Sequence, residues 1–459
     1  MVRRSHQRLT TEVKPKIRIL APLRSRNFAL LWGGMAISLL GDGVYLVAIA
    51  WEALRLSNTT MTISLVGIAW MLPTVVLLLF GGALSDRADR RWLMLGASLV
   101  QALATGLIGL LVTLGAANLS AILVLVAVYG GANAFFLPAF ESIVPMLLSP
   151  DELAQASAVE QFIRPLAFAL VGPAAGGVLI AVSGTGTAFL LDAGTFLVPA
   201  CAVLAIRLRG RPVARQAPAR RSLTEIADAI RFVRANQWLS RTLLAAAMTM
   251  LLFVGPFQVL LPFVVKNGLH AGSGTLGMIR ACGGAGALIG AIAVGQRGVP
   301  GWPIRAMLVG WAFQCLTLAG FALAADGWLF AAISLVGGAF GAAANVVWGT
   351  MMKTRVPNDM LGRVASLDWL VSIGFVPVSY AITGPVAQAL GAQATLLGAG
   401  GLAAATLVWF AWRSPVPVGS RRRRAAGVAS GPRLRAAGGS AVGRPPVRAP
   451  QPVSRTVRG

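Results

Sequence analysis

The sequence predicts an all-α membrane protein in which twelve transmembrane helices form two pseudo-symmetric six-helix bundles. Hydrophobic residues make up 56% of the 459 residues, and charged residues make up only 12%. Long apolar runs recur along the chain, and each is close to the roughly 20 residues that an α-helix needs to cross a bilayer core. No soluble domain of this length requires so much apolar surface.

Twelve spans can be placed on the chain. The first six lie near residues 28–54, 62–83, 92–114, 119–140, 157–182 and 186–207, and the second six lie near 242–265, 274–295, 304–324, 328–350, 367–390 and 392–412. We therefore expect bundles of residues 28–207 and 242–412, joined by a central loop, 208–241. A weak internal repeat supports two related halves, because Asp151 after the fourth span corresponds to Asp359 after the tenth.

The segments outside the spans are basic. Residues 1–27 and 413–459 form basic tails, and the second tail lacks apolar periodicity and is expected to be disordered. In the central loop, Ser222 and Glu225 form a capping box that predicts an amphipathic helix on the membrane surface. Loops rich in Lys and Arg stay in the cytoplasm. We therefore expect a multi-pass protein of the cell (inner or plasma) membrane with both termini cytoplasmic.

A polar island between the second and third spans is the most informative stretch. Three arginines and two aspartates fall within residues 86–91. Placing one charged side chain in hydrocarbon costs several kcal/mol of free energy, so we expect this stretch to be a loop in water. A positive-inside loop would explain the arginines. It would not explain Asp86, because acidic residues contribute little to topology.

The island resembles the loop between the second and third helices of the major facilitator superfamily of transporters. The residues that match the family pattern are Gly82, Asp86, Arg87, Arg90 and Arg91. The chain departs from it at Asp89, where the family often has Gly, and in this respect is similar to the branch of macrolide-efflux-like and siderophore-exporter-like proteins. The resemblance implies that the loop is a conformational switch.

A second pattern in the fifth span resembles a motif of the exporters in this superfamily. It consists of Gly172, Pro173, Gly176 and Gly177. The longer form of the motif has a further Gly where this chain has Phe168. Generic packing of small residues is the alternative explanation, since glycines allow helices to approach closely and proline bends a helix.

Ionisable residues inside the spans are candidates for function. Asp42, Glu160 and Asp192 are the proton-coupling candidates, and Glu160 and Arg164 are spaced for an ion pair on one helix face. Asp42 is the preferred proton carrier, with a structural carboxylate as the alternative. Glu52 is interpreted as a helix end at the surface, and Arg280 receives no role. The resemblance implies that four further residues face the substrate cavity: Tyr45, Asn133, Gln258 and Asn345.

These observations predict a secondary active transporter that works by alternating access. We expect a proton-coupled exporter of an amphiphilic small molecule of the drug, macrolide or siderophore type. An uptake symporter or lipid flippase of the same fold is the alternative, and a polytopic membrane enzyme is the alternative from another class. The chain lacks a phosphate-binding loop and the usual hydrolase and zinc motifs, so we expect no enzyme activity.

The partners expected from the sequence are a small-molecule substrate, protons and the lipid bilayer. The charges lie in loops and tails, which suits topology and anionic headgroups rather than nucleic acid. The two histidines and three cysteines are scattered, so neither a metal site nor a cofactor is expected. The chain is expected to act as a monomer.

Asp86→Asn should reduce transport and leave equilibrium substrate binding within a few-fold of the wild type. Asp86 lies at the rim of the membrane, where the resemblance implies an electrostatic contact with Arg363 or with the start of the eleventh span. Transport and binding are measured on the purified, folded variant. Complete loss of binding would contradict a switching role.

Overall fold

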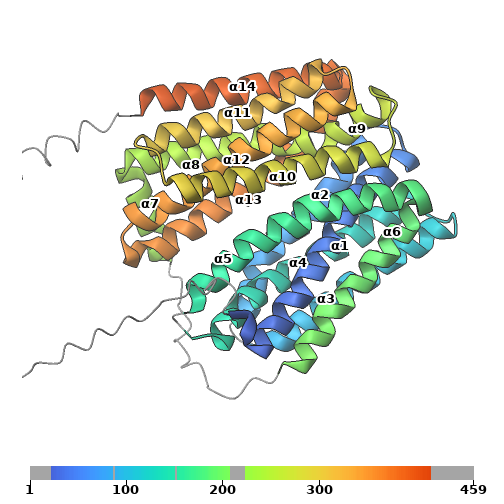
Figure 1. Ribbon diagram of the computed structural model, residues 1–459, viewed down its shortest axis with the longest axis horizontal. Helices are drawn as coiled ribbons and strands as arrows, with labels where there is room; N and C mark the ends of the chain where they lie inside the picture. The colour runs from blue at the N-terminus through green and yellow to red at the C-terminus, as the bar shows by residue number, and fades with distance from the viewer. Residues whose placement is uncertain (1–21, 86–87, 150–151, 207–222, 415–459) are drawn as a thin grey trace, which may run out of the picture. The chain divides into compact units, whose positions relative to one another are not determined.

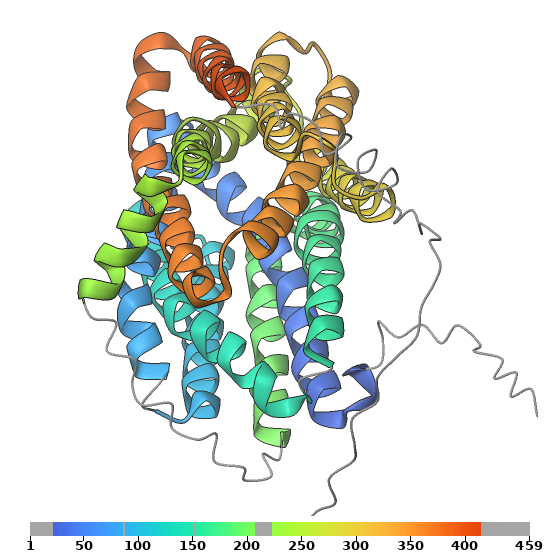
Figure 2. The same ribbon diagram turned by 90° about the vertical axis from the view of Figure 1, so that its left-hand side faces the viewer.

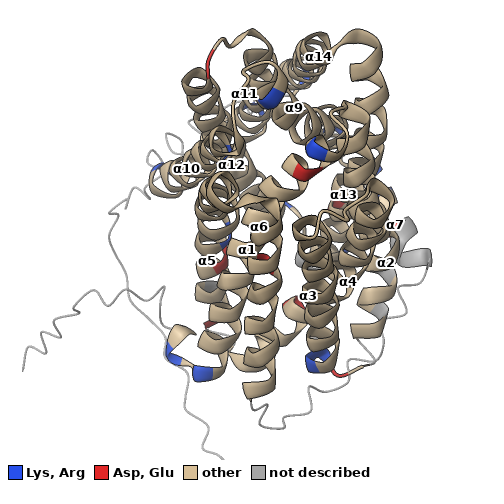
Figure 3. Cartoon of the chain, turned by 90° about the vertical axis from the view of Figure 1, so that its right-hand side faces the viewer, with Lys and Arg blue, Asp and Glu red and all other residues tan. Residues whose placement is uncertain are grey.

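The structure is a computed structural model that describes residues 22–85, 88–149, 152–206 and 223–414, and these ranges are almost entirely helical (Figure 1). The expectations for residues 1–21 and 415–459 of the tails, for Asp86 and Arg87, and for Ser222 lie outside the described residues. Charged residues are sparse along the long helices (Figure 3), as expected for helices that face hydrocarbon.

The first half of the chain, residues 26–205, consists of six α-helices and one π-helical segment. They are α1 (Arg26–Leu56), α2 (Thr60–Ser85), α3 (Arg90–Thr113), α4 (Leu119–Leu147), α5 (Leu153–Arg164), the π-helix η3 (Pro165–Val171) and α6 (Gly172–Ala205). Within this half, α1 packs along α6, α2 packs along α4, and α3 contacts both α4 and α6.

The second half, residues 223–413, has a similar build. Its elements are α7 (Leu223–Ala235), α8 (Gln237–Thr249), the π-helices η4 (Met250–Val254) and η5 (Pro256–Leu260), α9 (Leu261–Asn267), α10 (Ser273–Arg297), α11 (Pro303–Leu323), α12 (Gly327–Arg355), α13 (Asn358–Leu390) and α14 (Ala392–Arg413). Helix α10 packs along α12, and α11 packs along both α12 and α14. In the short helix α7, Val233 is buried in a cluster with Leu239 and Met352 of this half.

The predicted fold class is confirmed. Within the described residues, eleven helical stretches are long and apolar enough to cross a membrane, and one of them, Gln155–Ala205, has 51 residues. A helix of that length would measure roughly 77 Å, more than twice the thickness of the hydrocarbon core. Gly184 interrupts it with a φ of 83°, a backbone conformation that glycine adopts easily. Counted as two spans, this stretch brings the total to twelve.

The two halves meet along α2 and α13, along α6 and α10, and along η3 and α10. Figure 2 views them from the side on which α5 and α7 lie in Figure 1. Hydrogen bonds between the halves cluster at one end, which we call the closed end. They join Asn58 Nδ2 to Asn267 Oδ1 (2.6 Å), Lys266 Nζ to the Leu54 carbonyl (2.7 Å), Thr60 Oγ1 to the Gly384 carbonyl (3.2 Å) and Ser273 Oγ to the Gly177 carbonyl (3.3 Å).

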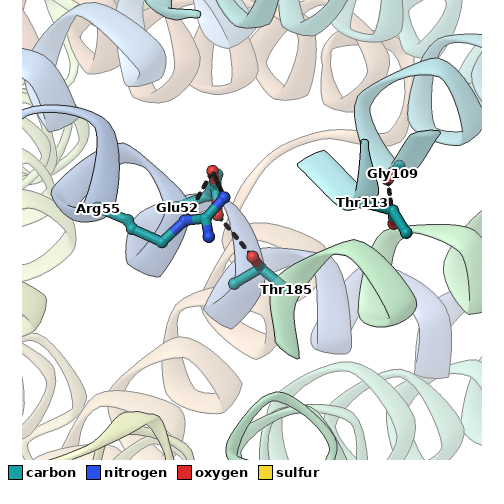
Figure 4. A network of polar contacts seen from close by, with 5 residues as sticks. All are labelled: Glu52, Arg55, Gly109, Thr113 and Thr185. Carbon is teal, nitrogen blue, oxygen red and sulfur yellow. Dashed lines mark hydrogen bonds and ion pairs between the residues drawn. The ribbon is translucent and has the colours of Figure 1, made fainter. Parts of the chain in front are cut away.

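Glu52 corrects the sequence-based interpretation of a surface helix end. Its side chain is fully buried at the end of α1, where it accepts hydrogen bonds from Arg55 Nη2 (3.0 Å) and from the Thr185 hydroxyl (Figure 4). Thr185 directly follows the turn at Gly184. The buried carboxylate therefore ties the end of α1 to the start of the second limb of α6, and its two donors offset the cost of burying the charge.

Glu52→Ala should lower the free energy of unfolding by about 2 kcal/mol, because it removes the charged acceptor of Arg55 and leaves the buried Thr185 hydroxyl without a partner. Asp228→Ala is the matched control. Asp228 pairs with Arg231 at the same sequence spacing and at a similar distance, 3.1 Å, but both side chains are exposed. Loss of an exposed pair costs less than about 1 kcal/mol.

Thermal unfolding of the purified protein in one detergent compares the two variants. The assignment of Glu52 as a structural anchor is contradicted when both variants melt at the wild-type temperature.

Candidate substrate and proton site

A cavity of about 230 Å³ lies inside the first half around Asp42, and we call it the Asp42 cavity. Its polar lining comes from Ser38, Asp42, Tyr45, Gln101, Tyr129, Asn133 and Arg164, and its apolar lining includes Trp70, Phe136, Phe168 and Phe196. It thus contains two of the predicted cavity residues, Tyr45 and Asn133. A mostly aromatic wall with a few convergent polar groups is typical of small-molecule sites.

Asp42 is held by a hydrogen bond from another helix. The hydroxyl of Tyr129, in α4, donates to Asp42 Oδ1 at 2.6 Å, a short distance that is usual for an O–H donor and a carboxylate acceptor. The Tyr129 ring stacks on the Tyr45 ring, with centroids 4.7 Å apart and planes at 16°. Both tyrosines are buried. The carboxyl group of α1 is therefore connected to α4 through a rigid aromatic pair.

Asp192 is a second acid directly beside α1. It is fully buried in α6, its Oδ1 accepts a hydrogen bond from Thr195 Oγ1 at 3.2 Å, and its Oδ2 has no hydrogen-bond partner among the described residues. A side chain at Gly41 would collide with Asp192 Oδ1 and Thr195 Oγ1. The glycine before Asp42 therefore makes room for Asp192, whose carboxylate lies against the backbone of α1 at the residue next to Asp42.

The predicted ion pair in α5 is present. Arg164 Nη2 lies 3.1 Å from Glu160 Oε1, with 40% and 35% of the two side chains exposed. Arg164 also lines the Asp42 cavity, whereas Glu160 does not. The pair therefore places a compensated cation at the wall of the Asp42 cavity.

A second cavity, of about 210 Å³, lies between the halves, and we call it the Arg280 cavity. Its polar lining comes from Gln258, Arg280, Gln314, Thr317 and Ser334 of the second half, whereas Leu46, Phe168, Ala169 and Pro173 come from the first half. Phe168 lines both cavities and stands between them.

Of the two remaining cavity candidates, Gln258 and Asn345, only Gln258 lines a cavity. Gln258 lines the Arg280 cavity and accepts a hydrogen bond from Arg280 Nη2 at 2.9 Å. Asn345 lines neither cavity; it accepts a hydrogen bond from Trp311 Nε1 at 3.0 Å. Sequence reasoning did not single out Tyr129 and Gln314, and it named Phe168 only as a departure from the exporter motif. Tyr129 lies in the same predicted span as Asn133, one turn away.

Three π-helical segments supply residues to the cavities. Segment η3 carries Phe168, η4 carries Phe253, and η5 carries Phe257 and Gln258. Both η3 and η5 begin at a proline, which removes a backbone donor from the helix. Such widened turns are frequent at functional sites, and their shared position here supports the assignment of the cavities as the functional region.

In the loop motif, the described residues have structural roles. Asp89, at the position where the pattern departs from the family, caps α3, because its side chain accepts the Arg91 backbone N–H at 2.9 Å. The Arg91 guanidinium donates to the Val203 carbonyl (3.0 Å) and the Leu204 carbonyl (3.2 Å) in the last turn of α6. Asp89 and Arg91 therefore fix two helix ends.

The other described positions of the motif are less constrained. Arg90 Nη1 lies 2.8 Å from the sulfur of Met146 in α4. A side chain at Gly82 would meet no neighbour within 4 Å, whereas one at Gly81 would collide with the Ala134 carbonyl of α4. The close approach of α2 and α4 thus depends on Gly81, and the structure gives no steric reason for Gly82.

The motif in the fifth span lies at helix contacts. A Cβ atom at Gly172 would lie 2.7 Å from Gly43 Cα of α1, and one at Gly176 would lie 2.9 Å from Val44 Cα. A Cβ atom at Gly177 would lie 2.9 Å from Gly277 Cα of α10, across the boundary between the halves. Pro173 lines the Arg280 cavity. The motif therefore packs α6 against α1 and against the other half.

Two six-span halves around cavities that contain intramembrane ionisable groups define a transporter of the major facilitator superfamily. Residues 17–431 match the model of the family described as transmembrane secretion effector, and the chain belongs to this family.

Three relatives of the chain are named as efflux pumps or exporters. The multidrug efflux pump Tap of Mycolicibacterium fortuitum is 27% identical over 82% of this chain and 91% of that protein. Macrolide efflux protein A of Streptococcus pyogenes is 21% identical over 82% of this chain and 93% of that protein. The enterobactin exporter EntS of Citrobacter koseri is 28% identical over 72% of this chain and 78% of that protein. The predicted family and branch are confirmed.

The fold agrees with solved transporters. The crystal structure of the nucleoside transporter NupG superposes with a TM-score of 0.61 at 14% identity, over 84% of this chain and 100% of that chain. Since the family consists of transporters, the chain is a multi-pass membrane transporter of an exporter family and not an enzyme.

Gly177→Ala should weaken the closed end. Its new methyl group would lie 2.9 Å from Gly277 Cα and from the Ser273 carbonyl oxygen, so that backbone of α10 must move away. Gly194→Ala is the matched control in the same helix, because a Cβ atom there meets nothing within 4 Å.

A single cysteine at Leu269, which is partly buried beside the closed-end contacts, is introduced into a chain without its native cysteines and reports the change through its rate of alkylation. Faster alkylation in Gly177→Ala and an unchanged rate in Gly194→Ala are expected. Equal rates in the two variants would show that Gly177 does not hold the halves together.

Proposed function

We propose that this transporter exports an amphiphilic small molecule by exchange for protons, and that Asp42 carries the proton. The observation that supports this most strongly is the position of Asp42 at the wall of an intramembrane cavity, hydrogen-bonded to Tyr129 and backed by Asp192. Functional use is the default for an acid inside a membrane span, because a purely structural acid there is expensive to keep.

The chemistry of the two acids favours an exchangeable proton. Asp42 receives one hydrogen bond from Tyr129 and shares its cavity with Arg164, which is already paired. Asp192 Oδ2 receives none from the described residues. Two adjacent buried carboxyl groups repel each other when both are ionised. A proton on one of them relieves both the repulsion and the cost of burial.

Alternating access turns this proton into a driving force. When the cavity faces the more acidic side, Asp42 binds a proton, and the neutral cavity permits the halves to close over it. When the cavity faces the cytoplasm, Asp42 releases the proton and a substrate enters. Proton release and substrate binding then alternate at one site, which gives exchange with opposite directions of movement.

The walls of the cavities suit an amphiphilic substrate. Phe136, Phe168 and Phe196 offer apolar and aromatic surface, while Gln101 and Asn133 offer hydrogen bonds. The relatives are named for multidrug efflux, macrolide efflux and enterobactin export. By analogy we assign the same broad substrate class, of the drug, macrolide or siderophore type, to this chain.

The orientation follows from charge. Lys- and Arg-rich loops place both termini in the cytoplasm, and the closed end then faces the outside. In this arrangement the structure corresponds to a state that is closed towards the outside. We also assign the chain as a monomer, because one chain supplies both halves of the substrate path. An uptake symporter or a lipid flippase would use the same fold, and the direction of uphill movement distinguishes them.

Asp42→Asn should abolish uphill export, because the amide cannot exchange a proton, while downhill exchange of substrate continues. The substrate comes from a susceptibility screen of cells with and without the gene, and export is measured in proteoliposomes with an imposed pH gradient. Asp368→Asn is the matched control: Asp368 is a half-buried acid that accepts a hydrogen bond from Trp348 Nε1 at 3.1 Å and lines neither cavity.

Uphill export at the wild-type rate in Asp42→Asn would make Asp42 a structural acid. Asp192 and Glu160 would then be the next proton carriers to test.

A further inference from the structure

Arg280 is a buried cation that the proton-exchange mechanism does not use. It lies in α10, and only 7% of the residue is exposed. Its Nη2 donates to Gln258 Oε1 at 2.9 Å, and its guanidinium carbon lies 5.6 Å from the centre of the Phe257 ring. Its Nε is buried and has no hydrogen-bond partner among the described residues.

No acid among the described residues forms an ion pair with Arg280. The ion pairs between described residues are Arg55–Glu52, Arg164–Glu160 and Arg231–Asp228, and Arg280 belongs to none of them. A guanidinium stays ionised in proteins. An amide oxygen and an aromatic face reduce the cost of burying it but do not neutralise it. The positive charge of Arg280 is therefore left uncompensated by the described residues, and an anionic group at this site would be stabilised by it.

The residues around Arg280 form a cavity with both polar and apolar walls. The guanidinium lines the Arg280 cavity together with Gln314, Thr317 and Ser334, which can hydrogen-bond a polar group. Phe253 and Phe257 form an apolar wall on the same cavity. Because Phe168 and Pro173 of the first half complete the lining, an occupant contacts both halves at once.

We propose that Arg280 binds the carboxylate, sulfonate or phosphate group of the exported amphiphile, whose apolar body lies against Phe253 and Phe257. The planar guanidinium fork suits such oxyanions, and its free Nε supplies a donor that Gln258 leaves unused. The Asp42 cavity, with its acid pair, then takes the uncharged part of the molecule beyond Phe168. This inference rests on the proposed function only in taking the Arg280 cavity as part of the substrate site.

The test compares two probes of nearly the same shape. 1-Naphthylacetate carries a carboxylate, and 1-naphthylacetamide carries a neutral amide in its place. Isothermal titration calorimetry measures both on the full chain in phosphatidylcholine nanodiscs, without a proton gradient. We expect the wild type to bind the acid about tenfold or more tightly than the amide, as for a charge-assisted hydrogen bond.

Variants locate the preference. Arg280→Gln should bind acid and amide with equal affinity, and Arg280→Lys should keep part of the preference. Arg231→Gln is the control, since Arg231 is an arginine paired with Asp228 that lines neither cavity, and it should keep the full preference. Asp42→Asn should keep it too, so that failure of proton coupling and failure of the anion site are distinguished.

Several results would overturn the proposal. They are equal affinity for acid and amide in the wild type, an unchanged preference in Arg280→Gln, and an equal loss in Arg231→Gln. Displacement of the acid by inorganic phosphate at the same concentration would make the site one for free anions. If the preference for the acid over the amide is lost in phosphatidylglycerol nanodiscs, the site binds an anionic lipid headgroup instead of the exported molecule. When Arg280→Gln does not fold, the wild-type comparison and Arg280→Lys decide.

Discussion

The cost of holding charge inside a bilayer is the constraint on which the rest of the structure depends. For Glu52 this cost is offset by hydrogen bonds from the side chains of Arg55 and Thr185. For Arg164 it is offset by the carboxylate of Glu160, four residues earlier in the chain. Asp42 meets it only in part, through Tyr129, while Asp192 and Arg280 keep polar atoms without partners among the described residues. Glu52 ties two helices together, whereas Asp42, Asp192 and Arg280 line or adjoin the two cavities.

Phe168 is the residue shared by the Asp42 cavity and the Arg280 cavity. It stands in a π-helical segment, lines both cavities, and occupies the position at which the longer exporter motif has a glycine. The Phe168 ring therefore lies where the Asp42 cavity and the Arg280 cavity meet. Each cavity alone is smaller than a typical ligand pocket of about 300–1,000 Å³. Under the proposed function, a drug-sized substrate would therefore have to displace this ring.

Composition, span length and motif spacing predict the fold, because the bilayer sets helix length and excludes charge. They also predict the Glu160–Arg164 pair, since four residues on one helix fix its geometry. The proximity of Asp42 to Asp192 is not predictable in this way, because it arises where Gly41 lets α6 approach α1. For the same reason Glu52 is misjudged: its burial depends on Thr185, 133 residues further along the chain. Contacts between spans follow from tertiary packing, which the pattern of one span does not contain.

Infrared difference spectroscopy between acidic and alkaline solution tests the central claim most directly, because it observes a protonated carboxyl group without a substrate. If Asp42 carries the proton, the wild type shows a carboxyl C=O band that appears on acidification, shifts when the Tyr129 hydroxyl is removed in Tyr129→Phe, and is absent in Asp42→Asn. An identical band in the wild type and in Asp42→Asn would contradict it.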